Sequence, residues 1–574
     1  MVEIFHARPA RVRCPLSAAL SAPPIVPTRG KLSQRKVSEA KSGHLKRQFQ
    51  CVLCSRGGRF IKCIASCSEL INHYAFQFPE GAPRKKKMSE RQPLLLQSDA
   101  SDYEGSRGSS ARPVRSSPPD NTLVNVHSED SLAVHAAASG SGDDERGPAD
   151  KSSYNPTHHR TLEHPTSNFD TLVHLLKGNI GTGILAMPDA FKNAGLYVGL
   201  FGTMIMGIIC THCMHMLVGC SHELCRRFQQ PSLDFSEVAY CSFESGPLGL
   251  RRYSTLARRI VTTFLFITQI GFCCVYFLFV ALNIKDVMDH YYKMPVQIYL
   301  LIMLGPMILL NLVRNLKYLT PVSLVAALLT VAGLAITFSY MLVDLPDVHT
   351  VKPVATWATL PLYFGTAIYA FEGIGVVLPL ENNMRTPEDF GGTTGVLNTG
   401  MVIVACLYTA VGFFGYLKYG EHVEGSITLN LPQGDTLSQL VRISMAVAIF
   451  LSYTLQFYVP VNIVEPFVRS HFDTTQAKDL SATVLRVVLV TFTFLLATCI
   501  PNLGSIISLV GAVSSSALAL IAPPIIEVIT FYNVGYGRFN WMLWKDFLIL
   551  IFGLAGFVFG TWASLAQIVN DRTH

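Results

Sequence analysis

The sequence predicts an all-α, polytopic membrane protein of about eleven transmembrane helices. Charged residues make up 15% of the 574 residues, against about 25% in a typical soluble domain. Apolar runs follow one another closely from Phe169 to the C-terminus. Two of these runs contain glycine pairs followed by a proline, a pattern that favours local unwinding of a helix. Together, these observations indicate a transmembrane transporter core over residues 167–574.

The residues before this core have a different composition. They are polar and rich in serine, proline, arginine and lysine, and residues 98–166 hold few aromatic side chains. Such a segment cannot bury enough apolar surface to offset the entropy lost on folding. We therefore expect a disordered cytosolic N-terminal tail over residues 1–166. A basic run at 84–87 precedes Met88, so we interpret residues 1–87 as an upstream extension before a natural start at Met88.

Two short motifs lie in this tail. Glu90, Leu94 and Leu95 form an acidic dileucine pattern that resembles endosomal and lysosomal sorting signals, and we predict that sorting adaptors bind it. A six-residue pattern also arises by chance, which is the alternative. The second motif is a group of four cysteines, Cys51, Cys54, Cys63 and Cys67. Their spacing leaves a zinc site open, but we favour unpaired tail cysteines and predict no metal and no cofactor.

Eleven apolar stretches are long enough to cross a bilayer, which takes about twenty helical residues. They lie near residues 171–190, 195–218, 258–284, 295–312, 319–343, 357–381, 396–417, 438–465, 482–499, 503–529 and 547–569. Because lysine and arginine are enriched in cytoplasmic loops, their distribution predicts the orientation. The loop between the second and third stretches carries Arg226, Arg227, Arg251, Arg252, Arg258 and Arg259. We therefore predict a cytosolic N-terminus and a C-terminus that is outside the cell or in an organelle lumen.

The first and sixth stretches each contain a Gly-x-Gly motif, followed by aliphatic residues and a proline. Residues 178–188 read GNIGTGILAMP, and residues 370–379 read AFEGIGVVLP. Unwound backbone at membrane depth is tolerated where it lines a cavity, and paired interruptions in two inverted halves mark the central site of many transporters. We predict a five-plus-five inverted repeat in which helices 1 and 6 are broken. The alternative is that these glycines only let helices pack closely.

Two ionisable side chains near the predicted breaks need an explanation, because charge inside a membrane is costly. His174 lies seven residues before Gly181, and histidine titrates near physiological pH, so His174 is a candidate proton-coupling residue. Its alternative role is a hydrogen bond in a helix packing seam. Glu372 lies inside the second break, where its carboxylate suits an ammonium ligand, a proton or the capping of exposed N–H groups.

These motifs resemble those of a known family. Residues 172–185, LVHLLKGNIGTGIL, look like the first span of the proton-coupled amino acid transporters, in the amino acid/auxin permease group. Residues 213–215 and 220–227 resemble the end of that family's second span, and residues 371–382, FEGIGVVLPLEN, resemble its sixth. The resemblance extends from about residue 165 to the C-terminus. It implies proton-driven transport of small neutral amino acids such as glycine, alanine and proline.

The resemblance also implies residue roles. The family's coupling histidine falls on His174. The substrate carboxylate would meet the main chain around Gly181, Thr182 and Gly183, and Phe371, Glu372 and Gly373 would face it. With the rest of the first break, the predicted substrate-binding set is Asn179, Ile180, Gly181, Thr182, Gly183, Phe371, Glu372 and Gly373.

We therefore predict a proton-coupled symporter of small neutral amino acids that works by alternating access. Its predicted partners are these amino acids, protons and the lipid bilayer of the plasma membrane or an endosomal or lysosomal membrane. The alternative is an endolysosomal amino acid sensor with little flux. We exclude nucleic acid, because the basic residues behind the net charge of +7 are scattered in the tail or lie between spans. No nucleophile–base pair or metal-ligand spacing predicts an enzyme.

Overall fold

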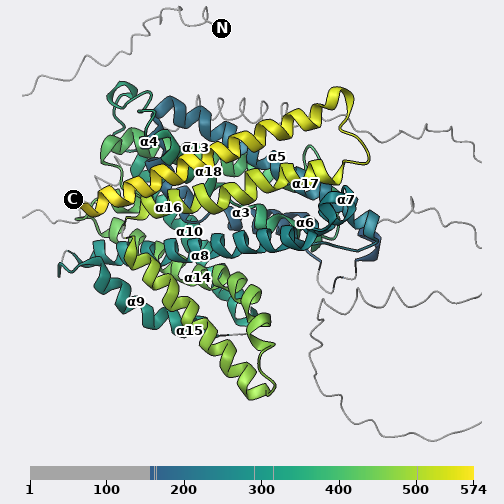
Figure 1. Cartoon of the computed structure of the whole chain (residues 1–574). Helices are drawn as coiled ribbons and strands as arrows, with labels where there is room; N and C mark the ends of the chain where they lie inside the picture. Colours follow the sequence, from purple (N-terminus) through teal and green to yellow (C-terminus); the bar gives the residue numbers. More distant parts are fainter. Residues whose placement is uncertain are drawn as a thin grey trace, which may run out of the picture. The chain divides into compact units, whose positions relative to one another are not determined.

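The computed structural model describes residues 156–573, except residues 161, 163, 164, 290, 314, 315 and 501, and Figure 1 shows the arrangement of its helices. The predicted sorting motif and the four tail cysteines lie outside the described residues. The longer helices are α3 (Asn168–Asn179), α4 (Thr182–Ala194), α5 (Leu196–Phe228), α6 (Phe235–Ser245), α8 (Ser254–Met288), α9 (Val296–Asn311), α10 (Leu316–Leu342), α11 (Leu360–Ala370), α12 (Ile374–Asn382), α13 (Val396–Tyr419), α14 (Thr436–Arg469), α15 (Thr475–Cys499), α16 (Leu503–Val510), α17 (Ala522–Thr530) and α18 (Trp541–Thr573).

The all-α prediction is confirmed for the described part of the chain. Nine helical stretches there are long and apolar enough to cross a membrane, and the apolar helix α9 is shorter, with 16 residues. The first predicted span is divided between α3 and α4. Because a helix satisfies its own backbone hydrogen bonds, such segments can cross lipid. The chain is therefore a multi-pass membrane protein, while the total of eleven spans and the inverted repeat stay predictions.

Long helices pack side by side around the two divided ones. α8 packs along α14, and α4 contacts both α11 and α13. The pair α9 and α15 lies at the lower left of Figure 1. α18 packs on α11 and α17 with one face, and exposes large apolar side chains such as Phe559 and Trp562 on another. Such an exposed apolar face suits contact with lipid tails.

One long helical stretch, from Leu503 to Thr530, changes its hydrogen-bonding pattern in the middle. Between α16 and α17 the residues Gly511–Ser515 (η9) and Ala517–Ile521 (η10) form π-helical turns. Such turns widen a helix locally and are frequent at functional sites. Both turns pack against α18, and η9 also packs against α11.

Candidate functional site

The first break separates α3 from α4. α3 begins with a capping box, in which the Ser167 hydroxyl accepts from the Asp170 N–H and the Asp170 carboxylate accepts from the Ser167 N–H, both at 3.2 Å. The helix ends at Asn179, and Ile180 and Gly181 have non-helical dihedral angles. α4 then begins at Thr182 without a side-chain cap, so its first N–H groups have no partner within the helix.

The second break separates α11 from α12. α11 ends at Ala370, and Phe371 and Gly373 depart from helical geometry before α12 begins at Ile374. The prolines of the two motifs do not mark the breaks, since Pro188 and Pro379 lie inside α4 and α12. The prediction of interrupted helices at both motifs is therefore correct, and the interruption lies at the glycine-containing segments.

A small pocket lies between the two breaks. Its lining residues are Gly178, Asn179, Gly181, Thr182, Gly183, Phe272, Tyr276, Tyr369, Ala370, Glu372 and Gln456. The space open to a water-sized sphere is about 20 Å³, close to what one water molecule needs. In this closed arrangement the pocket cannot hold an amino acid, so the surrounding helices must separate to admit one.

Two glycines allow the breaks to approach each other. A Cβ atom on Gly183 would lie 2.8 Å from the Cα of Ala370, and one on Gly373 would lie 2.9 Å from the Asn179 side-chain oxygen. Real Cβ atoms do not approach other atoms so closely, so a larger residue at Gly183 would push α4 away from α11, and one at Gly373 would displace the Asn179 side chain. Here glycine is required by close contact between the two divided helices.

Tyr408 of α13 joins the two breaks. Its hydroxyl lies 2.5 Å from the main-chain oxygen of Asn179 and 2.8 Å from that of Ala370. These carbonyl groups belong to the last residues of α3 and α11, where helical partners are lacking. A further bond between the hydroxyls of Thr182 and Tyr369, at 2.9 Å, ties the start of α4 to α11.

Two polar oxygens at the breaks have no hydrogen-bond partner among the described residues. They are Oε2 of Glu372 and Oδ1 of Asn179, both buried. The buried hydroxyl of Ser515, in the π-helical turn η9, lies close to the Glu372 carboxylate. A buried polar atom without a partner costs about 1–3 kcal/mol, so these atoms are suited to binding a polar ligand.

The structure brings together part of the predicted substrate-binding set. Asn179, Gly181, Thr182, Gly183 and Glu372 line the pocket. The other three predicted residues, Ile180, Phe371 and Gly373, do not line it.

Phe371 and His174 lie elsewhere. Phe371 is fully buried and packs against the Tyr408 ring, with 5.0 Å between ring centroids. His174 lies on an exposed face of α3 and does not line the pocket. Lys177, which follows it on α3, donates to the Ser323 hydroxyl of α10.

Several pocket residues were not predicted. Phe272 and Tyr276 come from α8, Tyr369 from α11 and Gln456 from α14, and the Gln456 amide donates to the Tyr276 hydroxyl at 3.4 Å. Gln456 is an uncharged amide in the middle of a predicted span, and polar groups at such depth usually face a protein interior or cavity. That signal was available, whereas nothing local in the sequence separates Tyr276 from other aromatic residues.

A segment within the predicted N-terminal tail binds to the end of α12. Arg160 forms two hydrogen bonds to the carboxylate of Glu381, at 3.1 and 3.2 Å, and Glu381 is completely buried at the end of α12. His222 of α5 contacts the same carboxylate at 2.9 Å. These contacts join residues from three distant parts of the sequence.

The residues that follow Arg160 continue this connection. The Thr166 N–H donates to the Asn383 carbonyl and the Arg385 N–H donates to the Thr166 carbonyl, at 2.9 and 3.0 Å. Asn168 donates to Asp389 at 2.9 Å. The segment before α3 is thus bound to the segment after α12. These bonds hold the start of the first broken helix close to the end of the second.

Asp389 lies in the loop between α12 and α13, and its carboxylate accepts these hydrogen bonds as a charged group. Donors from Asn168 and Thr386 hold the pKa of the Asp389 carboxyl below its usual value. The contribution of this contact to folding is therefore present at neutral pH and is lost as the pH falls through that lowered pKa.

Comparisons with known proteins identify the family of this chain. Residues 164–566 match the family model described as transmembrane amino acid transporter protein. The chain is 42% identical over 419 residues to the proton-coupled amino acid transporter-like protein pathetic of Drosophila melanogaster, covering 73% of this chain and 88% of that protein. It is 28% identical over 433 residues to amino acid transporter AVT3C of Arabidopsis thaliana, covering 71% and 92%.

Solved structures similar to this chain are more distant in sequence. The inward-facing conformation of Mhp1 has 12% identity and a TM-score of 0.42, covering 72% of this chain and 94% of that one. MhsT in complex with L-phenylalanine has 12% identity and a TM-score of 0.37, covering 71% and 99%. The family match and the 42% identical relative are decisive: the chain belongs to the transmembrane amino acid transporter family and is a transporter, not an enzyme.

Proposed function

We propose that this protein is a proton-coupled symporter of small neutral amino acids, such as glycine, alanine and proline, that works by alternating access. The observation that carries the proposal is the meeting of two broken helices around one small pocket with free main-chain groups and a single carboxylate. The Drosophila relative is named as a proton-coupled amino acid transporter-like protein, which supports the coupling ion.

The two breaks offer both kinds of partner that a zwitterion needs. The uncapped start of α4 presents N–H groups at the positive end of a helix dipole, which suits the substrate carboxylate at Thr182 and Gly183. The unpartnered Oε2 of Glu372 and the nearby carbonyl groups at the end of α11 suit the ammonium group. Asn179 and Gly181 complete the wall next to the substrate.

Close packing supports a preference for small side chains. The approach of Gly183 to Ala370 and of Gly373 to Asn179 leaves little room between the breaks. Neither Ile180 nor Phe371 lines the pocket, and Phe371 is buried against Tyr408. A large substrate side chain would have to separate α4 and α11 further than glycine or alanine would.

We place proton coupling on His174, which lies on α3 within two turns of the break. Its exposed position allows it to exchange protons without passing through the substrate pocket. Protonation would add a charge to α3 and shift the balance between the two orientations, so a falling pH would raise transport through the histidine range.

The orientation and location follow from the sequence. We propose a cytosolic N-terminus, a C-terminus outside the cell or in a lumen, and residence in the plasma membrane or an endosomal or lysosomal membrane. Sorting adaptors would bind Glu90, Leu94 and Leu95. Microscopy of the tagged protein, with and without the double substitution Leu94→Ala and Leu95→Ala, tests the sorting role. An unchanged distribution of the protein among cell membranes would contradict that role.

Electrical recording tests the transport proposal. Full-length protein in vesicles or cells should give inward current with glycine, alanine or proline that is larger at about pH 5.5 than at about pH 7.5, since these values bracket the titration of imidazole. His174→Ala should abolish the current while delivery to the membrane is unchanged. His422→Ala, which alters an exposed histidine in the loop after α13, is the matched control and should behave like the native chain.

The same recording separates the rival interpretations. Equal currents at both pH values would overturn proton coupling. Binding of labelled amino acid with almost no flux per molecule would favour the sensor alternative. A panel that includes large and charged amino acids would show whether the small pocket sets the substrate range.

A further inference from the structure

A second group of ionisable side chains lies away from the central pocket, where α17 meets α18. Glu527 of α17 is 6% exposed, and Asp546 of α18 is 1% exposed. The ammonium group of Lys545, also on α18 and largely buried, lies 2.6 Å from Glu527 Oε2 and 3.2 Å from Asp546 Oδ1. These three groups connect the end of the tenth predicted span to the start of the eleventh.

The formal charges of this group do not balance. Two carboxylates and one ammonium leave one uncompensated negative charge in a buried position. A buried charge without a partner costs several kcal/mol, and more in lipid than at a protein surface. The cluster therefore needs one further positive charge, and no described arginine, lysine or histidine other than Lys545 forms an ion pair with either carboxylate.

The positions of the two acids indicate what that charge is. The ammonium of Lys545 contacts both Glu527 Oε2 and Asp546 Oδ1, so one cation holds the two carboxyl groups close together. Apart from the ammonium of Lys545, the two buried oxygens of Asp546 have no donor among the described residues. Ionised carboxylates only accept hydrogen bonds, so a proton bound by one of the pair would supply the donor that these oxygens lack.

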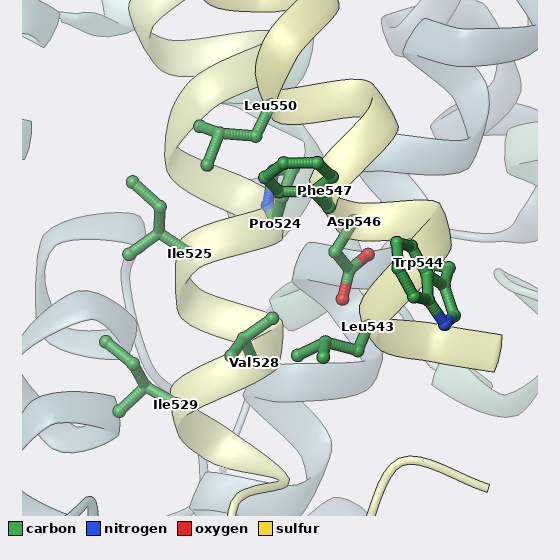
Figure 2. A pocket seen from close by; sticks show the side chains of 9 residues that line it. All are labelled: Pro524, Ile525, Val528, Ile529, Leu543, Trp544, Asp546, Phe547 and Leu550. Carbon is green, nitrogen blue, oxygen red and sulfur yellow. The ribbon is translucent and has the colours of Figure 1, made fainter. Parts of the chain in front are cut away.

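The surroundings of Asp546 favour a proton over a metal ion. Figure 2 shows its side chain at the edge of a groove between α17 and α18, among apolar side chains that include Val528, Leu543 and Phe547. Sodium, magnesium and calcium ions need several oxygen ligands, which this apolar lining does not supply.

Other titratable groups face the cluster from the neighbouring elements. They are His212, Cys213 and Cys220 of α5, and Tyr536 of the loop before α18. α6, which packs on α17, carries Glu237 and Glu244, and α11, which packs on α18, carries Tyr363 and Tyr369. The π-helical turns η9 and η10 also pack on α18, and their side chains are apolar residues and serines. Arg227 of α5 donates to the Thr530 carbonyl of α17, but its charge is paired with Glu223 at 2.8 Å. The other groups named here carry no permanent positive charge, so the imbalance is not removed.

We propose that Glu527 and Asp546 hold one proton between them, so that the junction of α17 and α18 is a proton-binding site separate from the central pocket and from His174. The bound proton neutralises the second carboxylate, while Lys545 compensates the first. The proposal concerns protonation and not uptake, so it stands or fails independently of the proposed symport.

Infrared spectroscopy of the full-length protein in lipid vesicles at neutral pH tests this site. The native chain should show the carbonyl absorption of a protonated carboxyl group, shifted when the vesicles are transferred to heavy water. Asp546→Asn and Glu527→Gln should each remove this absorption from the difference spectrum, because either leaves one carboxylate with one lysine. Lys545→Met should increase it, because both acids must then be protonated.

Glu465→Gln is the matched control. Glu465 is paired with two arginines, Arg469 at 2.8 Å and Arg486 at 3.3 Å, so it has no need of a proton. Its substitution should leave the absorption unchanged. If Asp546→Asn does not reach the vesicles, Glu527→Gln and Lys545→Met give the same information. The proposal is overturned if neither amide substitution produces a native-minus-variant difference at this absorption, or if the absorption does not rise in Lys545→Met.

Discussion

The hydroxyl of Tyr408 lies 2.5 Å from the main-chain oxygen of Asn179, the residue at which the first broken helix ends. The same hydroxyl lies 2.8 Å from the oxygen of Ala370, at the end of the other broken helix. A single side chain on an unbroken helix thus fixes the distance between the two breaks. This relationship makes the geometry of the pocket depend on α13, which contributes no residue to its lining.

Tyr408→Phe should therefore weaken transport without preventing folding. The variant loses a hydrogen bond worth about 1 kcal/mol and leaves the two carbonyl groups without this donor. We expect uptake at low substrate concentration to fall several-fold. Tyr416→Phe is the control, because it removes a buried tyrosine hydroxyl from the same helix that donates to Glu421 and contacts neither break. Similar uptake in both variants would show that Tyr408 has no particular role at the breaks.

Gly183→Ala should abolish uptake. The added Cβ would lie 2.8 Å from the Cα of Ala370, so α4 and α11 would have to separate and the N–H groups at the start of α4 would move. The protein should still reach the membrane, as measured by surface labelling or fractionation. Gly219→Ala on α5 is the control, since an added Cβ there meets no atom within 4 Å. Normal uptake by Gly183→Ala would contradict the close contact.

Glu372→Gln tests the proposed contact with the substrate ammonium. Hydrogen bonds to charged groups contribute about 1.5–3 kcal/mol, which corresponds to roughly a tenfold to hundredfold change in affinity. We expect the KM for glycine or alanine to rise by that range. Glu388→Gln, in the exposed loop after α12, controls for loss of an acidic side chain. An unchanged KM would show that Glu372 does not bind the substrate ammonium.

Arg160→Met should lower thermal stability markedly. It would leave the carboxylate of Glu381, which is completely buried, with the contact to His222 but without the guanidinium. Breaking a buried ion pair costs about 3–5 kcal/mol. The midpoint temperature of unfolding in detergent or lipid would measure the loss, and the double variant Arg160→Met, Glu381→Gln should recover part of it.

The control for the ion pair between Arg160 and Glu381 is an exposed ion pair. Lys352 and Glu421 lie 3.1 Å apart with both side chains about half exposed or more. Such pairs contribute about 0–1 kcal/mol, so Lys352→Met should change the midpoint little. If the two single variants lose equal stability, the buried connection between the N-terminal segment and α12 does not hold the fold together.

The sequence was most informative where a pattern is local. Hydrophobic length predicted the helices, because each must satisfy its own backbone in lipid. The two Gly-x-Gly motifs predicted interrupted helices at the correct places, because the freedom of glycine is a property of the residue itself. Five of the eight predicted binding residues line the pocket for the same reason: the breaks are short, and their neighbours lie next to them.

The sequence was less informative about which way side chains point. His174 lies seven residues before Gly181, a spacing of about two helical turns, yet its side chain is exposed and outside the pocket lining. Phe371 lies in the break but packs against Tyr408. At a break the helical periodicity is interrupted, so the spacing that normally predicts a shared face no longer applies.

By itself, then, the sequence determined the helical membrane architecture, the positions of the two breaks and the small residues that allow them to approach. Only the tertiary structure decided that Tyr408 spans both breaks, that Tyr276 and Gln456 reach the pocket, that Arg160 is tied to Glu381, and that Lys545 contacts both Glu527 and Asp546. The physical reason is that each of these contacts joins different helices or segments. Their geometry depends on how the elements pack, and no spacing along one helix records it.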